Sequence, residues 1–434
     1  MAPSPFKIVI VGAGPAGLAT ALALIHQRKN DATTASPVRI TVLERRDSVQ
    51  TLGGAINLTP LALRYLDSLG AGKALREASS PVSAIELVGH RLGNILVKLW
   101  PGVDAIRILR QTLVEGLLAA LKEQSSDDGD VTIVYGAKIT TMEQFGSEDS
   151  SSEGVRVAWT QNGAEHTADA HLLIGCDGIH SQVRTALVDP EREKTYAGRS
   201  NAYGYAKVTP EEATRWTRSD GEPLIKDTTL IQNGSNSLLV TYFQKPEERD
   251  ALYLASLTPT PEPSGGSREG WSVLGADKEG IKQSILDNYK NGPLKCLPDI
   301  LDRCQEWFFF PIYMLSPGGR WSKGRVQLLG DAAHAMPPQG ESTGVAIEDG
   351  ILMAHVLSRR DSRTVPQMLA DYEQLRRKDI DTLYITTMRR FQTKGPTSWL
   401  GLVAWDWLAW FVCSYTNWTS DHFARDVRFF ELPE

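Results

Sequence analysis

The chain has 434 residues, of which 41% are hydrophobic and 23% charged, and its formal net charge is −6. This composition is ordinary for a globular protein and excludes disorder, collagen and coiled coil as descriptions of the whole chain. Because a single core usually stops growing near roughly 250–300 residues, we expect two domains or one domain with a large insertion. The slightly acidic charge balance gives no support to a nucleic-acid-binding protein.

The cysteines and the N-terminal residues give no sign of a zinc site, a disulfide framework or a secretory signal. The four cysteines form no CxxC pair, so neither a zinc site nor a disulfide framework is expected. No His/Cys/carboxylate cluster suggests a metal site. The N-terminal residues lack a basic segment followed by an apolar core, and they enter a strand-like run at Phe6. We therefore expect a cytoplasmic protein.

The first residues follow the order strand, glycine-rich turn, helix, strand, acid. Phe6–Val11 has the apolar, β-branched character of a buried parallel strand, and Leu18–His26 is typical of a helix. Between them lies a GxGxxG motif, residues 12–17, and Val38–Leu43 leads to Glu44. In a dinucleotide site the first glycine makes a tight turn and the second lets the pyrophosphate approach. The third lets helix and strand pack closely. Glu44 would accept from a ribose hydroxyl, but this motif alone does not separate NAD from FAD.

Two acidic motifs follow later strands of the same type. Asp177 comes after a predicted strand at His171–Ile174, and Asp331 comes after an apolar run that ends at Leu329. Each aspartate thus lies just past a buried strand, where α/β sheets bind their ligands. A carboxylate in that place can hold ribityl or ribose hydroxyls by charge-assisted hydrogen bonds.

With these three motifs in this order, the chain resembles the single-component FAD-dependent aromatic hydroxylases of the p-hydroxybenzoate and salicylate hydroxylase type. It looks most similar to their fungal biosynthetic branch, and the resemblance covers residues 7 to about 390. It implies non-covalent FAD, NADPH or NADH as electron donor, and O2 as co-substrate. It further implies oxygen transfer from a C4a-hydroperoxyflavin to an apolar aromatic or polycyclic small molecule, by hydroxylation or epoxidation, in secondary metabolism.

The resemblance also implies which residues hold the cofactor. The implied cofactor-binding residues are Gly12, Gly14, Ala16 and Gly17 (pyrophosphate loop), Glu44 and Arg45 (adenosine), Gly54 and Ala55 (loop beside the isoalloxazine), Arg110, Asp177, Asp331 (ribityl chain), Gly340 and Gly344. A helix predicted over Val345–Leu357 would point its N-terminus at the flavin and favour negative charge there. Glu341 departs from the family pattern at this end, so its orientation is open.

The expected fold is an α/β FAD-binding domain of the Rossmann type with an inserted, mainly antiparallel sheet domain. The predicted parts are residues 1–82, 101–189 and 322–395 for the FAD-binding domain, 83–100 (a hairpin) and 190–321 for the substrate domain, and 396–434 for a Trp-rich helical tail. The strands predicted by alternation are Ser200–Val208, Thr228–Gln232, Ser237–Phe243 and Ala251–Leu257, with a helix at Lys278–Asn288.

Candidate catalytic residues come from the predicted substrate sheet. Arg199, Tyr203 and Tyr205 could bind a phenolate or carbonyl oxygen, and Tyr242 and Arg107 are further candidates. The alternative interpretation for each is an exposed arginine or a sheet-packing tyrosine. His180 and His334 lie in the cofactor motifs and are interpreted as structural hydrogen-bonding groups rather than bases.

The C-terminal part combines a charged helix with a Trp-rich segment. Val365–Arg390 has the pattern of a surface-facing helix. From Trp399 to Cys413 only about 15 apolar residues follow, with an Asp inside, fewer than the ~20 that span a bilayer. We expect this tail to pack on the FAD-binding domain or over the pocket mouth, with a membrane-surface helix as the alternative.

Two other functions remain open from the sequence. One is an oxidase or halogenase of the same fold whose flavin is not reduced directly by NADPH. The other is a non-catalytic flavoprotein that docks through its tail. The sequence does not name the substrate, because the inward or outward sense of sheet residues cannot be read from one chain.

Overall fold

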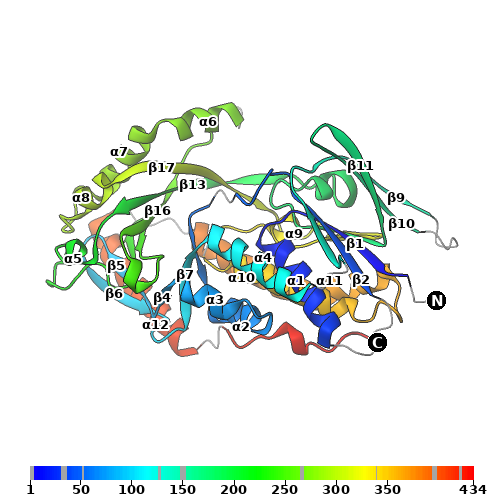
Figure 1. The fold of residues 1–434 in the computed structure, drawn as a ribbon. Coiled ribbons are helices and arrows are strands. Elements are labelled where there is room, and N and C mark those ends of the chain that lie inside the picture. The colour runs from blue at the N-terminus through cyan, green and yellow to red at the C-terminus, as the bar shows by residue number, and fades with distance from the viewer. Residues whose placement is uncertain are drawn as a thin grey trace.

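The computed structural model describes residues 4–30, 37–50, 53–125, 129–146, 153–263, 268–338, 340–392, 398–419 and 423–434. Two large sheets dominate this part of the chain, each with a layer of helices on one face (Figure 1). The predicted combination of an α/β domain with an inserted, mainly antiparallel sheet is confirmed. The predicted start of the tail, residue 396, lies outside the described residues.

The first sheet contains the strands that carry the predicted motifs. Its order is β18 (Ser322–Lys323), β19 (Val326–Leu328), β12 (Leu172–Gly175), β1 (Phe6–Val11), β2 (Val38–Leu43) and β8 (Val131–Val134). All neighbours are parallel except β18 and β19. The register sets Val11 beside Gly175, and Gly175 beside Leu328. The carboxyl ends of β1, β12 and β19 therefore meet at one edge.

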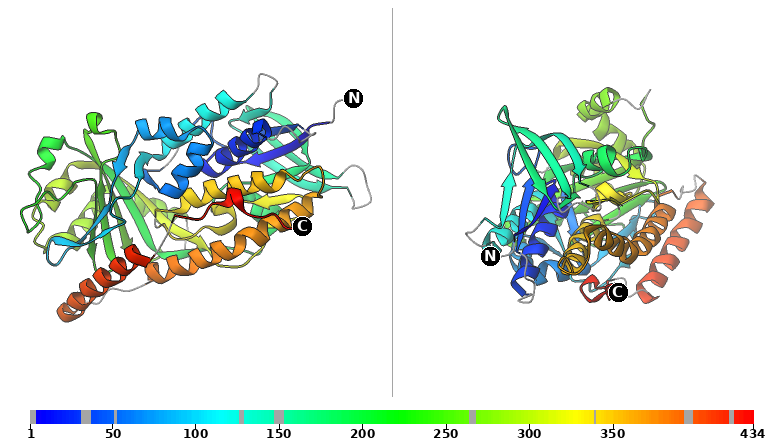
Figure 2. Two further views of the ribbon diagram at one scale, coloured as in Figure 1. Left: turned by 90° about the horizontal axis from the view of Figure 1, so that it is seen from below. Right: turned by 90° about the vertical axis from the view of Figure 1, so that its right-hand side faces the viewer.

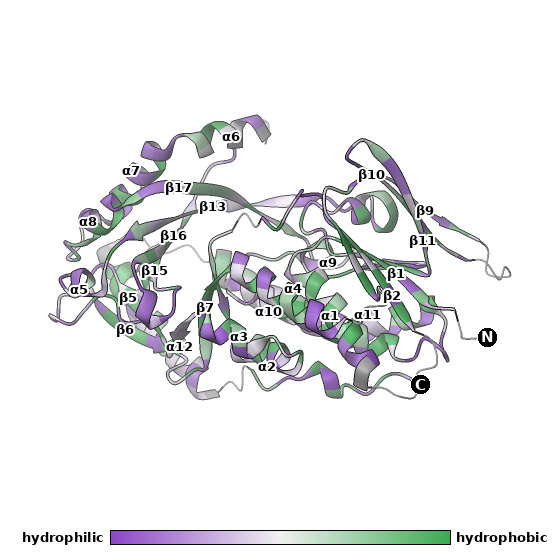
Figure 3. Cartoon of the chain, viewed as in Figure 1, coloured by the Kyte–Doolittle hydropathy of each residue, from purple (hydrophilic) through white to green (hydrophobic). Residues whose placement is uncertain are grey.

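The helices of the first domain lie mainly on one face of this sheet, while the other face contacts a small three-stranded sheet, residues 138–170, so both apolar faces of the strands are covered. The helices are α1 (Pro15–Asn30), α2 (Pro60–Ser68), α3 (Gly72–Glu77), α4 (Arg110–Gln124), α9 (Asp331–His334), α10 (Ser342–Leu357), α11 (Val365–Gln392) and the short π-helix η1 (Arg184–Val188). α1 packs against α4 and α10, and α10 also contacts α2 and α11. Figure 3 shows β1 and β2 coloured as hydrophobic. α11 was predicted to face the surface, but one stripe of it, including Met368, Tyr372 and Arg376, is buried.

Two small sheets complete the first domain. One has the order β3 (Ala55–Leu58), β7 (Ala105–Leu109), β4 (Ser80–Val82). The other has the order β11 (Ala164–Ala170), β10 (Gly154–Gln161), β9 (Lys138–Phe145), and the sequence did not predict it. β11 is mostly exposed and polar on both faces, so it lacks the apolar alternation by which strands are identified.

The second sheet has seven strands. Its order is β17 (Cys304–Leu315), β13 (Lys194–Lys207), β16 (Ala251–Pro259), β15 (Asn236–Thr241), β14 (Thr228–Asn233), β5 (Ile85–Gly89) and β6 (Asn94–Leu99). The hairpin expected within 83–100 is β5–β6, and it joins through the parallel pair β14–β5. β17 was not predicted, because Pro311 and a continuous aromatic run hide its alternation.

The two faces of the second sheet have different neighbours. One face is covered by three helices, α6 (Arg268–Ala276), α7 (Lys278–Tyr289) and α8 (Leu297–Asp302) (Figure 1). Two shorter helices, α5 (Pro210–Ala213) and η2 (Pro246–Glu248), lie in the connections between the strands. On that face Ala202, Leu254 and Trp307 belong to a core that includes Ile285 of α7. On the opposite face Tyr203, Phe243 and Tyr253 pack with Ala55 of β3. This opposite face is where the two domains meet.

The Trp-rich tail forms α12 (Trp399–Thr419), which lies against β6, the edge strand of the second sheet. Arg91 donates to Asp406 at 2.8 Å, and the amide of Asn417 bonds the backbone of Trp100 and Lys98. This helix therefore packs on the second sheet, and the expectation that it packs on the FAD-binding domain is wrong. It lies on the outside in both views of Figure 2. No helix in the described ranges has the length and hydropathy needed to cross a lipid bilayer.

The last described residues return to the first domain. The guanidinium of Arg64 donates to the carbonyls of Phe423, Ala424 and Arg425. The turn η4 (Val427–Phe429) follows, with Val427 fully buried. This final segment, residues 423–434, is the part of the tail that does pack on the α/β domain.

Candidate functional site

The glycine loop after β1 has the geometry that its motif demands. Gly12 has φ +103°, and a Cβ there would lie 2.5 Å from the carbonyl oxygen of Cys176. A Cβ on Gly17 would lie 2.0 Å from the carbonyl oxygen of Gly12. By contrast, the described atoms leave the space beside Gly14 open to 4 Å. The loop thus has two positions closed by backbone and one where a ligand can approach.

This difference predicts distinct effects for two glycine substitutions. Gly17→Ala forces backbone apart, so we expect about 1–3 kcal/mol lower stability of the FAD-free protein. Gly14→Ala should leave that stability unchanged and weaken FAD binding, because its methyl group occupies the open space. Urea unfolding of the apoprotein and FAD titration of both variants check this. Equal apoprotein stabilities would contradict the role of Gly17.

The carboxylate of Glu44, at the end of β2, turns back to the same loop. It accepts hydrogen bonds from the backbone N–H of Ala13 at 3.0 Å and of Arg46 at 2.9 Å. Each carboxylate oxygen can accept a further bond, so a ribose hydroxyl can still be bound. Arg45 is exposed beside it.

The two predicted aspartates lie at the ends of neighbouring strands. Asp177 Oδ2 accepts from the N–H groups of Gln182 and Val183, at 2.6 and 3.2 Å, while its buried Oδ1 has no hydrogen-bond partner. Burial raises the pKa of Asp177. Asp331 begins α9, and a Cβ on the preceding Gly330 would lie 3.3 Å from Cβ of Ala16. A chain of acceptors therefore runs along this edge beside the glycine loop.

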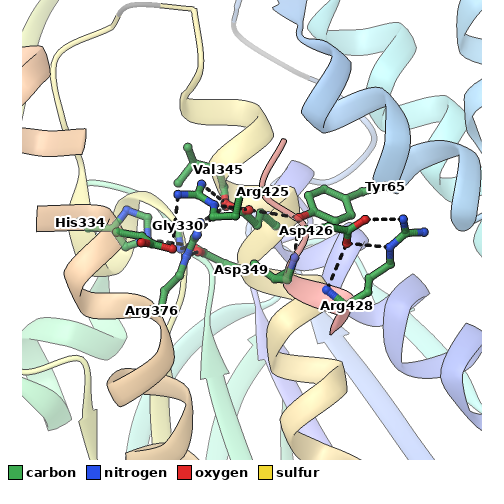
Figure 4. Close-up of polar contacts among 12 residues, drawn as sticks. Tyr65, Gly330, His334, Val345, Asp349, Arg376, Arg425, Asp426 and Arg428 are labelled. Atoms are coloured by element: carbon green, nitrogen blue, oxygen red, sulfur yellow. Dashed lines mark hydrogen bonds and ion pairs between the residues drawn. The ribbon is translucent and has the colours of Figure 1, made fainter. Parts of the chain in front are cut away.

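A buried network of charges holds the backbone just before Asp331 (Figure 4). Asp349 Oδ2 accepts from the N–H of Gly330 at 2.9 Å and lies 2.7 Å from His334 Nε2. Burial alone would raise the pKa of Asp349, but His334 and Arg376 outweigh it and hold the pKa well below its ordinary value. The interpretation of His334 as a structural group agrees with this contact. His180 contacts Lys194 at 2.6 Å near the surface.

Arg376 of α11 is the centre of this network and is fully buried. It donates to Asp349 at 2.7 Å, to Glu348 at 2.6 Å and to the carbonyl of Val345 at 3.1 Å. Arg425 of the final segment pairs with the same Glu348 at 2.6 Å (Figure 4). Two carboxylates on α10 and two arginines from later parts of the chain thus fasten the loop that presents Asp331.

The small sheet positions the next predicted residues. The N–H of Arg110, the first residue of α4, donates to the carbonyl of Gly54 at 3.3 Å. A Cβ on Gly54 would lie 2.2 Å from the ring of Tyr253, so that ring sits directly over the loop. Ala55 belongs to the apolar cluster with Tyr203 and Tyr253. Burial raises the pKa of Tyr203, and the nearby Arg110 guanidinium partly offsets this shift.

The glycines just before α10 and in its first turn have different roles. Gly340 has φ +85°, and a Cβ there would be 3.9 Å from Cβ of Asn57. A Cβ on Gly344 would lie 3.2 Å from Cβ of Ala62, so Gly344 has a packing role against α2. Glu341 is the N-cap residue of α10, and its side chain does not cap the helix.

The three candidate catalytic residues are not all together. Tyr203 stacks on Phe308 with ring centroids 5.1 Å apart, and Tyr205 lies 5.7 Å from Tyr253. Arg199 points instead to α11, with its guanidinium 4.9 Å from the ring centroid of Phe391. Of the further candidates, Tyr242 lies on the helix-covered face.

The tyrosines of the inter-domain face stay protonated and can serve as hydrogen-bond donors. Burial, together with Tyr203, raises the pKa of Tyr205 to about 12. Burial also raises the pKa of Tyr253 and of Tyr203. All three phenols are therefore neutral near pH 7 and can donate a hydrogen bond to a substrate oxygen. Sequence reasoning missed Tyr253 and Asn57, since strand alternation shows which residues share a face but not which face points inward.

These features fit FAD. The space at Gly14, the unpartnered Oδ1 of Asp177 and the carboxylate of Asp331 line one edge, as a dinucleotide with a ribityl chain requires. No group of three or more His, Cys, Asp or Glu side chains suited to a metal ion occurs in the described ranges. Fold and site together define a dinucleotide-binding flavoprotein.

Comparison with known proteins gives the family. The sequence matches the family described as FAD binding domain over residues 6–226 and 318–384, and the chain belongs to it. Phenazine 1,6-dicarboxylic acid hydroxylase PhzS of Lysobacter antibioticus is 29% identical over 391 residues, 85% of this chain and 86% of the relative. FAD-dependent monooxygenase atnJ of Arthrinium sp is 25% identical over 389 residues, 89% of this chain and 84% of the relative.

A solved structure shares the fold. HpxO of Klebsiella pneumoniae, complexed with FAD and uric acid, superposes with a TM-score of 0.70 at 21% identity, over 95% of this chain and 96% of that one. The predicted resemblance to FAD-dependent aromatic hydroxylases is thus confirmed for the family. The protein is an FAD-dependent oxidoreductase of the hydroxylase and monooxygenase class.

Proposed function

We propose that the protein uses NADPH or NADH and O2 to insert one oxygen atom into an aromatic or polycyclic small molecule, in secondary-metabolite biosynthesis. The observation that carries this proposal is the aromatic face of the second sheet. Tyr203, Tyr205 and Tyr253 face Gly54 and Ala55, in the loop expected beside the isoalloxazine. Aromatic rings pack favourably on such a surface.

The proposed cofactor roles follow the geometry of the edge. Gly12, Gly14, Ala16 and Gly17 would shape the pyrophosphate loop, and Glu44 with Arg45 would hold the adenosine. The remaining groups of the proposed FAD site are Gly54, Ala55, Arg110, Asp177, Asp331, Gly340 and Gly344. When bound, FAD supplies the transfer of electrons from the nicotinamide cofactor and the activation of O2.

The chain's own contribution to the chemistry is positioning and exclusion of water. The neutral phenols of Tyr203 and Tyr205 would donate hydrogen bonds to a substrate oxygen. The surrounding rings of Phe243 and Phe308 keep this face apolar, which protects a reactive intermediate from water. Arg199 lies against Phe391, apart from the tyrosines, and its catalytic role stays a prediction.

Anaerobic mixing of the FAD-loaded protein with NADPH tests the proposal. Flavin bleaching is followed with and without a panel of phenols, indoles and polycyclic aromatics, and O2 is then admitted. We expect one class to accelerate bleaching and to yield a product that carries one added oxygen. Absence of bleaching with every compound would favour the oxidase or halogenase alternative, in which NADPH does not reduce the flavin directly.

The exposed face of α12 supports a proposal about partners. Its polar residues Asp406 and Asn417 turn inward, while an apolar stripe faces outward. The stripe is formed by Leu400, Trp407, Leu408, Phe411, Tyr415 and Trp418, which are all more than half exposed. Tryptophan and leucine on one uncharged helix face suit a lipid–water interface, so the proposed partner is a membrane surface.

Flotation with phosphatidylcholine vesicles checks this proposal. Replacing Trp407, Phe411 and Trp418 together by serine should lower vesicle binding by roughly tenfold or more, since each buried aromatic contributes about 1.5–3 kcal/mol. Val273→Ser, at an equally exposed apolar position on α6, is the control. Vesicle binding that is absent, or unaffected by the triple change, would contradict it, and a concentration-dependent dimer would assign the stripe to a second copy.

A further inference from the structure

Arg107, in the middle of β7, is a buried cation without a counter-charge. Its side chain is only 5% exposed, its Nε has no hydrogen-bond partner, and no ion pair reaches its guanidinium among the described residues. The other buried arginines in those ranges all have partners. Arg184 donates to two carbonyls, Arg218 pairs with Glu86, and Arg376 pairs with Glu348 and Asp349.

Such a group is costly unless something pairs with it. An uncompensated buried charge costs several kcal/mol, so buried arginines are normally matched by acceptors. Burial lowers the pKa of Arg107 to about 10, and within the described ranges Tyr253 is the titratable neighbour that partly offsets this shift. At neutral pH Arg107 therefore remains a cation, and the neutral phenol of Tyr253 cannot balance it.

A second unpartnered group lies next to Arg107. Asn57 of β3 is directly opposite it in the antiparallel pair β3–β7, so both side chains project from the same face. Asn57 is 8% exposed, and its buried Oδ1 has no hydrogen-bond partner. A guanidinium and an amide thus lie side by side, and each has a buried polar atom without a hydrogen-bond partner.

These two groups lie at the proposed substrate face. Asn57 adjoins Gly340, in the segment before α10, and Arg107 adjoins Tyr253, whose ring covers Gly54. Arg110, three residues further, begins α4 beside the same loop. The anion that Arg107 lacks would therefore belong to a molecule held between β7 and the aromatic face of β13 and β16.

We propose that Arg107, assisted by the N–H donor of the Asn57 amide, is the specificity-determining residue that binds an anionic oxygen of the substrate. The substrate class is then an aromatic molecule that carries a carboxylate or an ionised phenol, with its ring against Tyr203, Tyr205 and Tyr253. A guanidinium suits both groups, because its planar fork of N–H donors matches such oxygens. This inference rests on the proposed function and narrows its substrate from any aromatic to an acidic one.

The test measures binding rather than turnover, by the change in flavin absorbance of the FAD-loaded protein. The probes are benzoate and naphthoate against their neutral amides, and p-nitrophenol against its methyl ether. The wild type should bind at least one acidic probe more tightly than its neutral partner. Arg107→Met should weaken that probe roughly ten- to a hundredfold, with little change for the neutral partner and for FAD itself. Comparison of the carboxylate probes with the phenol probe shows which of the two anions Arg107 binds.

Three variants keep the result interpretable. Arg107→Lys keeps the charge without the fork and should retain part of the preference, while Asn57→Ala should reduce it. Arg215→Met removes an exposed arginine and should change nothing. The proposal is overturned if the wild type has no preference for any acid, if acidic and neutral probes weaken equally, or if Arg107→Met mainly releases FAD. If acid binding depends on Arg107 but no oxygenated product forms, this inference stands and the proposed function fails.

Discussion

Replacing Arg376 by methionine is expected to lower the free energy of unfolding by about 3–5 kcal/mol. The change removes the cation that neutralises Glu348 and Asp349, both fully buried, and leaves carboxylates that water cannot solvate. Arg425 and His334 remain as partial partners, so the protein should still fold. Urea unfolding with saturating FAD measures the loss.

The effect of Arg376→Met should depend on pH. In the wild type the pKa of Asp349 lies below its ordinary value, so its contribution is present above about pH 4 and is lost as the pH falls further. In the variant the buried carboxylate of Asp349 loses one of the two cations that hold its pKa down, so its protonated form is favoured. The difference in stability should therefore be largest near neutral pH and shrink towards pH 4. Lys378→Met, on the exposed side of the same helix, is the control, and an equal loss in both variants would contradict the assignment.

Replacing Asp331 by alanine is expected to weaken FAD binding roughly ten- to a hundredfold. A charge-assisted hydrogen bond contributes about 1.5–3 kcal/mol, and the Asp331 carboxylate is at the edge where the ribityl chain is expected. The fold should be unaffected, because Asp331 is half-exposed and the loop is held through Gly330. FAD titration of the apoprotein, followed by flavin fluorescence, measures the change.

The amide variant separates charge from shape at this position. Asp331→Asn keeps the size and one acceptor, so it should lose less affinity than Asp331→Ala. Full FAD occupancy in the alanine variant at low FAD concentration would remove Asp331 from the site. Equal losses in both variants would mean that the charge, rather than a hydrogen bond, is what the cofactor requires.

Local patterns in the sequence were sufficient for the strands and turns that carry the motifs. β1, β12 and β19 are short buried strands, and each is followed by its glycine or aspartate, so neighbouring residues alone indicate them. The parallel register then places Gly12, Asp177 and Asp331 at one edge. The second sheet was also largely predicted, apart from β17, whose aromatic run has no clear alternation.

The predictions that were wrong or incomplete share one cause, which is that they depend on contacts between residues far apart in sequence. The sequence pattern of α12 shows an apolar helix, but only the tertiary structure shows that its polar residues turn inward to Arg91 and Lys98. The pattern of α11 is that of a surface helix, yet Arg376 is buried. Ion pairs with Glu348 and Asp349, which are far away in sequence, offset the cost of removing its charge from water. Arg199 and Tyr203 lie on the same side of β13, but their different neighbours separate them.

The amino-acid sequence by itself therefore determined the family, the cofactor and the order of the motifs, since these depend on residues within a few positions of one another. Only the tertiary structure decided which side chains share the inter-domain face and which buried groups lack partners. Asn57 and Arg107 meet through strand pairing, and Tyr253 reaches Arg107 from another domain. Such contacts are set by packing over long sequence separations, which local periodicity does not encode.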